Sequence, residues 1–176
     1  MTQSATATAP YPPLIAWLDS HHIPYELHEH RRTYTAAETA DAEGTDPTTF
    51  AKVVGVRTSD GSNALVVVDA SDRVDLALLR DAMDVAWVAL LGEAGLRTLL
   101  PDCDVGTLPP IPALVKVPVY VDEAVRTDDR ISFHAGSHEH TVRVDRAAWE
   151  REAKIRPGTF SMRRRSLSDI ADRGWI

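Results

Sequence analysis

Lysine and cysteine are both scarce in this chain. The 176 residues include 19 basic side chains, of which only three are lysines, and the single cysteine is Cys103. One cysteine excludes an intrachain disulfide and a zinc site built from several thiolates. Long apolar runs are also missing, because no stretch approaches the roughly 18 residues that a membrane-spanning helix needs. The first ten residues lack the basic and apolar parts of a secretion signal. We therefore expect a soluble, cytoplasmic protein with no membrane contact.

Positive charge is in short supply and unevenly placed. The net charge of −7 argues against broad binding to nucleic acid such as DNA, because that binding relies on lysine and arginine. Residues 1–145 carry 11 basic and 22 acidic side chains, whereas residues 146–176 carry 8 basic and 4 acidic ones. Any phosphate contact is therefore expected toward the C-terminal end.

Length and composition indicate one domain. At 176 residues with 44% hydrophobic content, the chain can bury a core of its own. We expect a flexible N-terminus over residues 1–11, a folded domain over residues 12–156 and a basic tail over residues 157–176. The tail contains Arg163-Arg164-Arg165-Ser166-Leu167-Ser168, which is typical of a flexible arm with hydroxyl groups that a kinase can modify.

Helix and strand signals follow one another irregularly. Thr35 and Glu38 form a capping box that predicts a helix over residues 36–43, ended by Gly44. Asp60-Gly61 predicts a tight hairpin between strands 51–57 and 63–69. Without a regular βαβ repeat, an α+β single domain around a mixed sheet is favoured. Other helices are expected from residue 12 and over 74–82, 92–100 and 146–155, and other strands over 23–28, 85–90 (buried), 117–121, 131–134 and 141–144.

Lys52 interrupts the apolar run of residues 50–56, inside the first strand of the expected hairpin. The ordinary explanation is an exposed lysine whose stem lies along apolar surface, because alternate side chains of a strand face outward. The other explanation is chemical. A primary amine held in a strand can present a positive charge to a ligand, and burial can move its pKa.

Two glycine-containing segments accompany this lysine. One is the loop Gly106-Thr107-Leu108-Pro109-Pro110, and the other is Ala135-Gly136-Ser137-His138, expected as a turn between two strands. Glycine lets backbone N–H groups approach a ligand, and two such loops could stabilise a developing oxyanion. Taken singly, each is an ordinary turn. No phosphate-binding glycine loop, nucleophile elbow or reactive cysteine motif is present.

Histidines and aromatic residues leave alternatives open. His134, His138 and His140 lie close in sequence and could bind a metal with His28 or His30, although histidines in hairpins are more often surface or hydrogen-bonded residues. His30 could instead line a pocket. Four aromatic residues are expected mainly in the core, with substrate contact as the alternative for the first: Tyr34, Trp17, Trp87 and Trp149.

Taken together, these segments resemble the YbaK/EbsC family of free-standing aminoacyl-tRNA deacylases, relatives of the editing domain in bacterial prolyl-tRNA synthetases. The similarity extends from about residue 15 to residue 145. The matching segments are residues 25–30, 34–40 and 50–54, Gly106 with Pro110 in a Gly-x-x-x-Pro loop, and residues 119–123 and 135–137. The resemblance implies a mostly antiparallel, barrel-like sheet core with surrounding helices.

The resemblance also implies an activity: hydrolysis of the ester in mischarged aminoacyl-tRNA that carries a small amino acid, with no cofactor. Lys52 matches the essential lysine of the family, and Gly106 and Pro110 match the loop that lines the aminoacyl pocket. Gly136 matches a glycine turn on the other side of the pocket. Asp122 occupies an acidic position after a strand, where a turn or cap role is the alternative.

Further substrate contacts are expected from His30, Tyr34, Ser137 and His138. In the family, a ribose hydroxyl of the tRNA is thought to help activate the water, which would explain the lack of a visible protein base. The expected partner is aminoacyl-tRNA, delivered by a synthetase or an elongation factor. The alternative is a protein that binds an aminoacyl-adenosine-like ligand without turnover, or an adaptor that acts through its tail.

Overall fold

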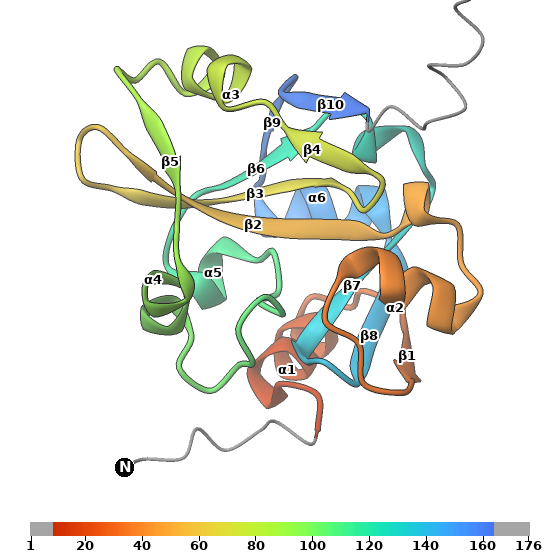
Figure 1. Ribbon diagram of the computed structural model, residues 1–176. Helices are drawn as coiled ribbons and strands as arrows, with labels where there is room; N and C mark the ends of the chain where they lie inside the picture. Colours follow the sequence, from red (N-terminus) through yellow and green to blue (C-terminus); the bar gives the residue numbers. More distant parts are fainter. Residues whose placement is uncertain (1–8, 164–176) are drawn as a thin grey trace, which may run out of the picture.

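The computed structural model describes residues 9–163 (Figure 1). Most of the expected flexible N-terminus and the expected basic arm from residue 164 onward lie outside the described residues. The helices are α1 (Pro12–Ser20), α2 (Ala36–Glu43), α3 (Leu76–Met83), α4 (Glu93–Leu99), α5 (Pro112–Val115) and α6 (Arg146–Ala153), with 3-10 turns η1 (Pro47–Thr49) and η2 (Val125–Thr127). The strands are β1 (Tyr25–Glu29), β2 (Ala51–Thr58), β3 (Asn63–Asp69), β4 (Asp72–Val74), β5 (Val88–Leu90), β6 (Val119–Asp122), β7 (Arg130–Ser137), β8 (His140–Asp145), β9 (Arg156–Gly158) and β10 (Ser161–Arg163).

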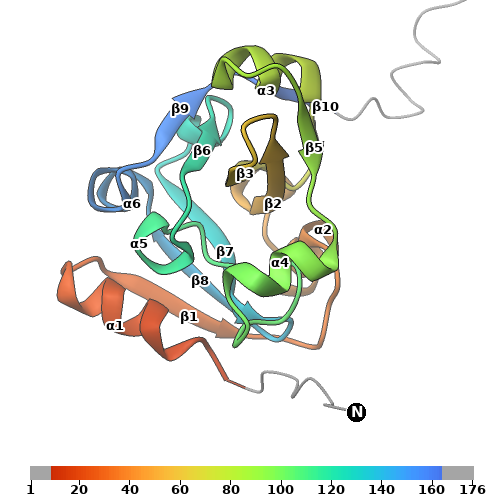
Figure 2. The same cartoon turned by 90° about the vertical axis from the view of Figure 1, so that its left-hand side faces the viewer.

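The strands form three sheets. Five strands pair in the order β5-β2-β3-β6-β9, three in the order β1-β8-β7, and β10 pairs with β4. Most pairs are antiparallel, but β3 with β6 and β6 with β9 are parallel. Helix α3 lies above the five-stranded sheet and α1 below it in both ribbon views (Figures 1 and 2). The mixed α+β single domain is therefore confirmed.

The described strands surround a common core without forming a closed barrel. The outer strands β5 and β9 have three residues each and end the larger sheet. An isolated bridge between Phe50 and Ser132 links this sheet to β7. Side chains fill the space between the two sheets instead, and they form the main core with α1 and α6.

Local signals placed several elements correctly. Helix α2 begins where Thr35 Oγ1 accepts from the Glu38 N–H at 3.1 Å, and it ends at Gly44, whose φ is 65°. The Glu38 carboxylate reaches back to the Tyr34 N–H at 3.0 Å. The hairpin β2–β3 turns at Gly61, whose φ is 84°, so glycine meets the need for a positive φ.

Three expected elements differ in the structure. A buried strand was expected at 85–90, but the structure has only the three-residue strand β5 there. Because β5 lies at the edge of the sheet and pairs only with β2, it is exposed, and Leu90 is 59% exposed. Strand β7 continues to Ser137, and its pairing with β8 is interrupted between His134 and Ser137 where a simple turn was expected. Residues 156–163 form β9 and β10, and Phe160 is fully buried, so this part of the expected tail belongs to the fold.

The aromatic residues divide into two groups. Trp17 and Trp149 are buried in the main core, as expected, and the Trp149 indole donates to the Pro110 carbonyl at 3.2 Å. Trp87 and Tyr34 are 50% and 70% exposed, so the core assignment was wrong for both. Trp87 directly precedes the edge strand β5, and Tyr34 lies just before helix α2. At both places one face of the chain is open to solvent.

Candidate functional site

Lys52 lies at the boundary between two cavities. Its side chain is partly buried on β2, opposite Val68 of β3, and its Nζ atom donates to the backbone carbonyl of Asp72 on β4. The Lys52 side chain therefore reaches from β2 to β4 rather than extending into solvent. Both cavities are lined by Lys52, Val54 and Leu90.

The first cavity has a volume of about 300 Å³, and we name it the α4 cavity because Leu96 of α4 forms part of its wall. Its walls are mainly apolar, with a few polar groups, which is the usual composition of a small-molecule site. Gly55 leaves room for this wall, since a Cβ there would lie 2.5 Å from Leu96 Cδ2. The lining residues are Tyr34, Thr35, Ala36, Lys52, Val53, Val54, Gly55, Leu90, Leu91, Leu96, Gly106, Leu108 and His134.

The second cavity, on the other side of Lys52, has a volume of about 320 Å³ and is named here the β4 cavity. It is lined by Lys52, Val54, Arg73, Val74, Leu76 and Leu90. A third cavity of about 620 Å³ shares only Tyr34 with the α4 cavity, and its wall includes Arg32, Arg97, Cys103, Asp104 and His138.

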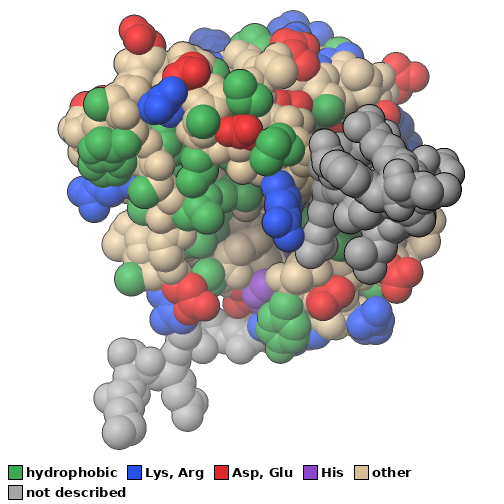
Figure 3. All heavy atoms as spheres, turned by 45° about the horizontal axis from the view of Figure 1, so that its top comes forward, with side chains coloured by type: hydrophobic (Ala, Val, Ile, Leu, Met, Phe, Trp, Pro, Cys, Tyr) green, Lys and Arg blue, Asp and Glu red, His purple; other side chains and the backbone are tan. Residues whose placement is uncertain are grey.

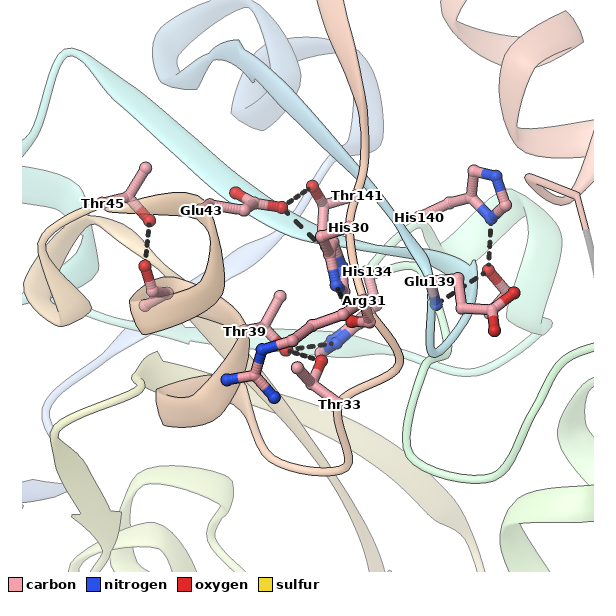
Figure 4. Close-up of polar contacts among 12 residues, drawn as sticks. His30, Arg31, Thr33, Thr39, Glu43, Thr45, His134, Glu139, His140 and Thr141 are labelled. Atoms are coloured by element: carbon pink, nitrogen blue, oxygen red, sulfur yellow. Dashed lines mark hydrogen bonds and ion pairs between the residues drawn. The ribbon is translucent and has the colours of Figure 1, made fainter.

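His134, a polar group in the wall of the α4 cavity, is held by a hydrogen-bond network (Figure 4). Its Nε2 atom lies 3.0 Å from Thr39 Oγ1. Thr39 Oγ1 also donates to the Thr35 carbonyl at 2.9 Å and lies 2.7 Å from Thr33 Oγ1. Because the Thr39 hydroxyl has one proton and gives it to Thr35, it accepts from His134, which leaves Nδ1 as the acceptor atom of the ring.

Burial keeps His134 uncharged. Desolvation, with smaller contributions from His138 and His30, lowers the pKa of His134 from 6.5 to about 3. A base this weak accepts a proton poorly at neutral pH. The ring can orient a ligand or water through a hydrogen bond, but it is not suited to act as the general base.

Cys103 is also chemically quiet. Burial, together with the nearby carboxylates of Asp102 and Asp104, raises the pKa of its thiol to about 12. The thiolate, which is the reactive form, is therefore negligible at neutral pH. The absence of a reactive cysteine motif in the sequence agrees with this environment.

The histidines do not assemble a metal site in the described part of the chain. Within residues 9–163, no group of three or more His, Cys, Asp or Glu side chains is placed to hold a metal ion. The rings of His30 and His138 lie 6.5 Å and 6.3 Å from that of His134, and His140 Nδ1 is 2.8 Å from Ser137 Oγ. Spacing in sequence suggested a cluster, but each ring has a different neighbour.

His30 lies beside the His134 network rather than in the wall of the α4 cavity. Its Nε2 atom is 3.8 Å from Glu43 Oε1, and both side chains are almost fully buried. Glu43 also accepts from the Thr141 hydroxyl (Figure 4). Glu43 thus connects α2 both to His30 and to Thr141 of β8.

The two expected glycine loops meet, but only one lines the α4 cavity. Gly106 lines it, has a φ of 87° and would meet nothing within 4 Å if it carried a Cβ. Gly136 instead holds the loop: its N–H donates to the Thr107 carbonyl at 3.1 Å, and its carbonyl accepts from Asp104 at 2.9 Å. A Cβ at Gly136 would lie 2.6 Å from Tyr11 Cβ.

Asp122 is engaged in holding the C-terminal strands. Its Oδ2 atom accepts from the N–H groups of Phe160 at 2.6 Å and Ser161 at 2.8 Å, and its Oδ1 atom accepts from Ala124 N–H at 2.9 Å. Pro110, Ser137 and His138 are likewise not among the residues that line the α4 cavity. Tyr34 lines both the α4 cavity and the third cavity.

Several residues of this region had not been singled out. Thr33, Thr39 and Glu43 form the polar support of His134 and His30, and Arg73 lines the β4 cavity. Thr39 follows the capping residue Thr35 by one helical turn, which was the one local signal that could have identified it. The others depend on contacts between distant segments.

Comparison with known proteins agrees with this arrangement. The sequence profile of the aminoacyl-tRNA editing domain matches residues 30–152. A comparison with curated protein sequences found no significant match. The fold is similar to that of the hypothetical protein APE2540, with a TM-score of 0.77 and 18% identity over 85% of this chain and 99% of the other. It is also similar to a proposed trans-editing enzyme for prolyl-tRNA synthetase, with a TM-score of 0.72 and 18% identity over 92% and 99% of the two chains.

The structural similarities concern the fold, whereas the sequence profile covers more than half of the chain. The profile region contains Lys52, His134 and Gly106, which come together at the α4 cavity. The described residues contain no helix long and apolar enough to cross a bilayer. The chain belongs to the family of aminoacyl-tRNA editing domains.

Proposed function

We propose that this protein hydrolyses the ester of mischarged aminoacyl-tRNA and releases a small amino acid and free tRNA. The observation that carries the proposal is the position of Lys52, an ammonium group fixed between two cavities of similar size. An aminoacyl ester has two unlike parts, the amino acid and the nucleotide, joined at the bond that is cleaved. A cation at the junction of two cavities suits that shape.

In this proposal Lys52 polarises the ester carbonyl and stabilises the oxyanion that forms when water attacks. The bond between the carbonyl carbon and the ribose oxygen breaks, the amino acid leaves as a carboxylate, and the ribose oxygen takes up a proton. The ester is already activated, so positioning and electrostatics supply most of the help required.

In this proposal no protein group acts as the general base: a ribose hydroxyl of the tRNA helps to position and activate the water, and the proton that the water loses passes to the ribose oxygen that leaves. Neither His134, whose pKa is about 3, nor Cys103, whose pKa is about 12, suits the role of general base at neutral pH. His134 and the Gly106 loop would instead orient the substrate from the wall of the α4 cavity. The apolar walls of this cavity favour a small side chain without charge.

A panel of tRNAs, each charged with a non-cognate amino acid, tests the activity. The unmodified protein should release free amino acid from at least one of them, and Lys52→Ala should reduce the rate by about 100-fold or more, as expected for loss of a group that stabilises an oxyanion. Lys116→Asn provides a matched control, because it removes an exposed ammonium at a left-handed position that asparagine tolerates. Equal rates for the two variants would contradict the role of Lys52.

The same assay separates the enzyme from a protein that only binds. Retention of charged tRNA on the unmodified protein, with no release of amino acid from any member of the panel, would favour the non-catalytic alternative. Since the chain has a net charge of −7, delivery of the tRNA by a synthetase or elongation factor in the cytoplasm is part of the proposal. Adding the cognate synthetase should then raise the rate at low tRNA concentration.

A further inference from the structure

His30 and Glu43 form a buried pair that has no part in the hydrolysis proposed above. Their side chains are 4% and 6% exposed, and Nε2 of His30 lies 3.8 Å from Oε1 of Glu43. The Thr141 hydroxyl donates to the same carboxylate oxygen (Figure 4). No lysine or arginine among residues 9–163 forms an ion pair with Glu43. A carboxylate held away from water requires a partner that is positively charged or donates hydrogen bonds, and His30 is placed to supply it.

The other ring nitrogen of His30 decides where its protons lie. Nδ1 is 2.6 Å from the backbone carbonyl oxygen of Arg31, and because a carbonyl oxygen only accepts, Nδ1 donates. A neutral ring with its proton on Nδ1 would turn the lone pair of Nε2 toward the Glu43 carboxylate, and neither atom could donate. Nε2 has no hydrogen-bond partner in the described part of the chain. A second proton, on Nε2, removes this conflict and makes the contact an imidazolium–carboxylate ion pair.

Glu43 acts on the α4 cavity through helix α2. Thr39 and Glu43 are four positions apart in this helix of eight residues, so they lie on the same face. Thr39 contacts His134 of β7, and Glu43 contacts Thr141 of β8. A displacement of α2 at Glu43 is therefore passed on, one helical turn away, to the hydroxyl that orients His134.

A positive charge on His30 also acts on His134. The two ring centroids are 6.5 Å apart, and both side chains are buried. On the face of the molecule in Figure 3, histidine side chain is visible over only a small area, at the edge of a hollow bordered by hydrophobic side chains. Burial is the main cause of the low pKa of His134, and the nearby rings of His138 and His30 lower it further. His134 thus remains neutral, with Nδ1 as a hydrogen-bond acceptor in the wall of the α4 cavity.

We propose that Glu43 and His30 are positioning residues of the editing site: their ion pair fixes α2 against β8, and α2 then holds Thr39 in place for His134. The ion pair itself is a property of the fold, whereas its effect on rate rests on the proposed function. Without the pair, the His134 ring loses its fixed orientation and the α4 cavity loses an oriented acceptor.

Glu43→Ala tests the inference, and Glu43→Gln is the conservative variant. Glutamine can accept from Thr141 and donate to Nε2 of a neutral His30, so it keeps both links. Asp41→Ala is the matched control, because it removes an exposed carboxylate of the same helix that has no ion pair among residues 9–163. For mischarged tRNA, Glu43→Ala should lower kcat/KM about tenfold through misplacement of His134. Glu43→Gln and Asp41→Ala should stay within about twofold of the unmodified protein.

Nitrogen-15 chemical shifts of the histidine rings at pH 7 report the pair without an assay of activity. In the unmodified protein and in Asp41→Ala, both ring nitrogens of His30 should carry a proton, and His134 should carry one on Nε2 only. In Glu43→Gln, His30 should lose its Nε2 proton while the His134 signals stay unchanged. In Glu43→Ala, the His134 signals should move as well, because its hydrogen bond to Thr39 is disturbed.

A neutral His30 ring in the unmodified protein would overturn the inference. Equal rates for Glu43→Ala and Asp41→Ala, or His134 signals that do not move in Glu43→Ala, would overturn the positioning role while leaving the proposed function intact. If the Glu43→Ala protein does not fold, Glu43→Gln decides, because a His30 ring that stays doubly protonated beside glutamine contradicts the ion pair. If the unmodified protein hydrolyses no substrate, the proposed function fails, and the ring shifts still test the pair and its effect on His134.

Discussion

The Nε2 atom of His134 lies 3.0 Å from the hydroxyl oxygen of Thr39, and this contact fixes an uncharged imidazole in the wall of the α4 cavity. The two residues come from β7 and α2, which are far apart in the sequence. Their contact joins the three-stranded sheet, through β7, to helix α2. It also defines which ring nitrogen is left to accept a hydrogen bond.

Stability should depend on pH through His134. Its pKa is about 3 in the folded protein and near 6.5 when exposed, so the unfolded chain binds one more proton between these values. Lowering the pH from 6.5 toward 3 therefore destabilises the fold, by up to about 1.4 kcal/mol for each pH unit from this one group. Urea unfolding at pH 7, 6 and 5 measures the slope.

His134→Gln is the matched variant, because its amide can still donate to Thr39 and it does not titrate. The variant should lose less stability than the unmodified protein between pH 7 and pH 5. An identical pH dependence in the two proteins would show that His134 does not titrate with a lowered pKa.

Three glycines with positive φ should respond differently to alanine. Gly136→Ala should destabilise the protein by about 2 kcal/mol or more, because the new Cβ meets Tyr11 and Cys103 in addition to the backbone strain. Gly106→Ala and Gly44→Ala have open space and should each cost about 1 kcal/mol. Thermal or urea unfolding gives these values.

The deacylation rate separates two of these variants. Gly106→Ala should lower the rate because Gly106 lines the α4 cavity, whereas Gly44→Ala, at the end of α2, should not. A Gly136→Ala protein as stable as the Gly44→Ala protein would contradict the close packing of this strand against Tyr11.

Asp122 should matter for stability more than for substrate contact. Asp122→Ala removes the acceptor for Phe160 and Ser161 N–H groups, and the free energy of unfolding should fall by about 2 to 4 kcal/mol. Hydrogen exchange should become faster in β10 and in its partner β4. Protection of β10 equal to that in the unmodified protein would argue that other contacts hold this strand.

Tyr34 should contribute to tRNA affinity through its ring. It is 70% exposed, lies between the α4 cavity and the third cavity, and its ring is 5.7 Å from the Arg32 guanidinium. Tyr34→Ala should raise KM for mischarged tRNA about tenfold, since stacking on a nucleobase is worth roughly 1–3 kcal/mol. Tyr34→Phe keeps the ring and should behave like the unmodified protein. A raised KM in both variants would indicate that the hydroxyl, not stacking, is responsible.

The sequence by itself determined the local elements and singled out one candidate cation. Helix α2 follows from Thr35, Glu38 and Gly44, and the β2–β3 hairpin follows from Asp60-Gly61, because their hydrogen bonds join residues only a few positions apart. Lys52 could be singled out because lysine is so rare in this chain and its neighbours are apolar.

The tertiary structure alone decided where that lysine lies and what it contacts. Lys52 and Asp72 are 20 positions apart, and Thr39 and His134 are 95 positions apart, so no local pattern predicts their contacts. Three further features depend on which segments the sheets bring together. They are the exposure of Tyr34, the hydrogen bonds from Asp122 to the C-terminal strands, and the presence of both Lys52 and Arg73 in the wall of one cavity. Burial and charge compensation are properties of that packing, because each depends on every neighbour that excludes water or carries the opposite charge.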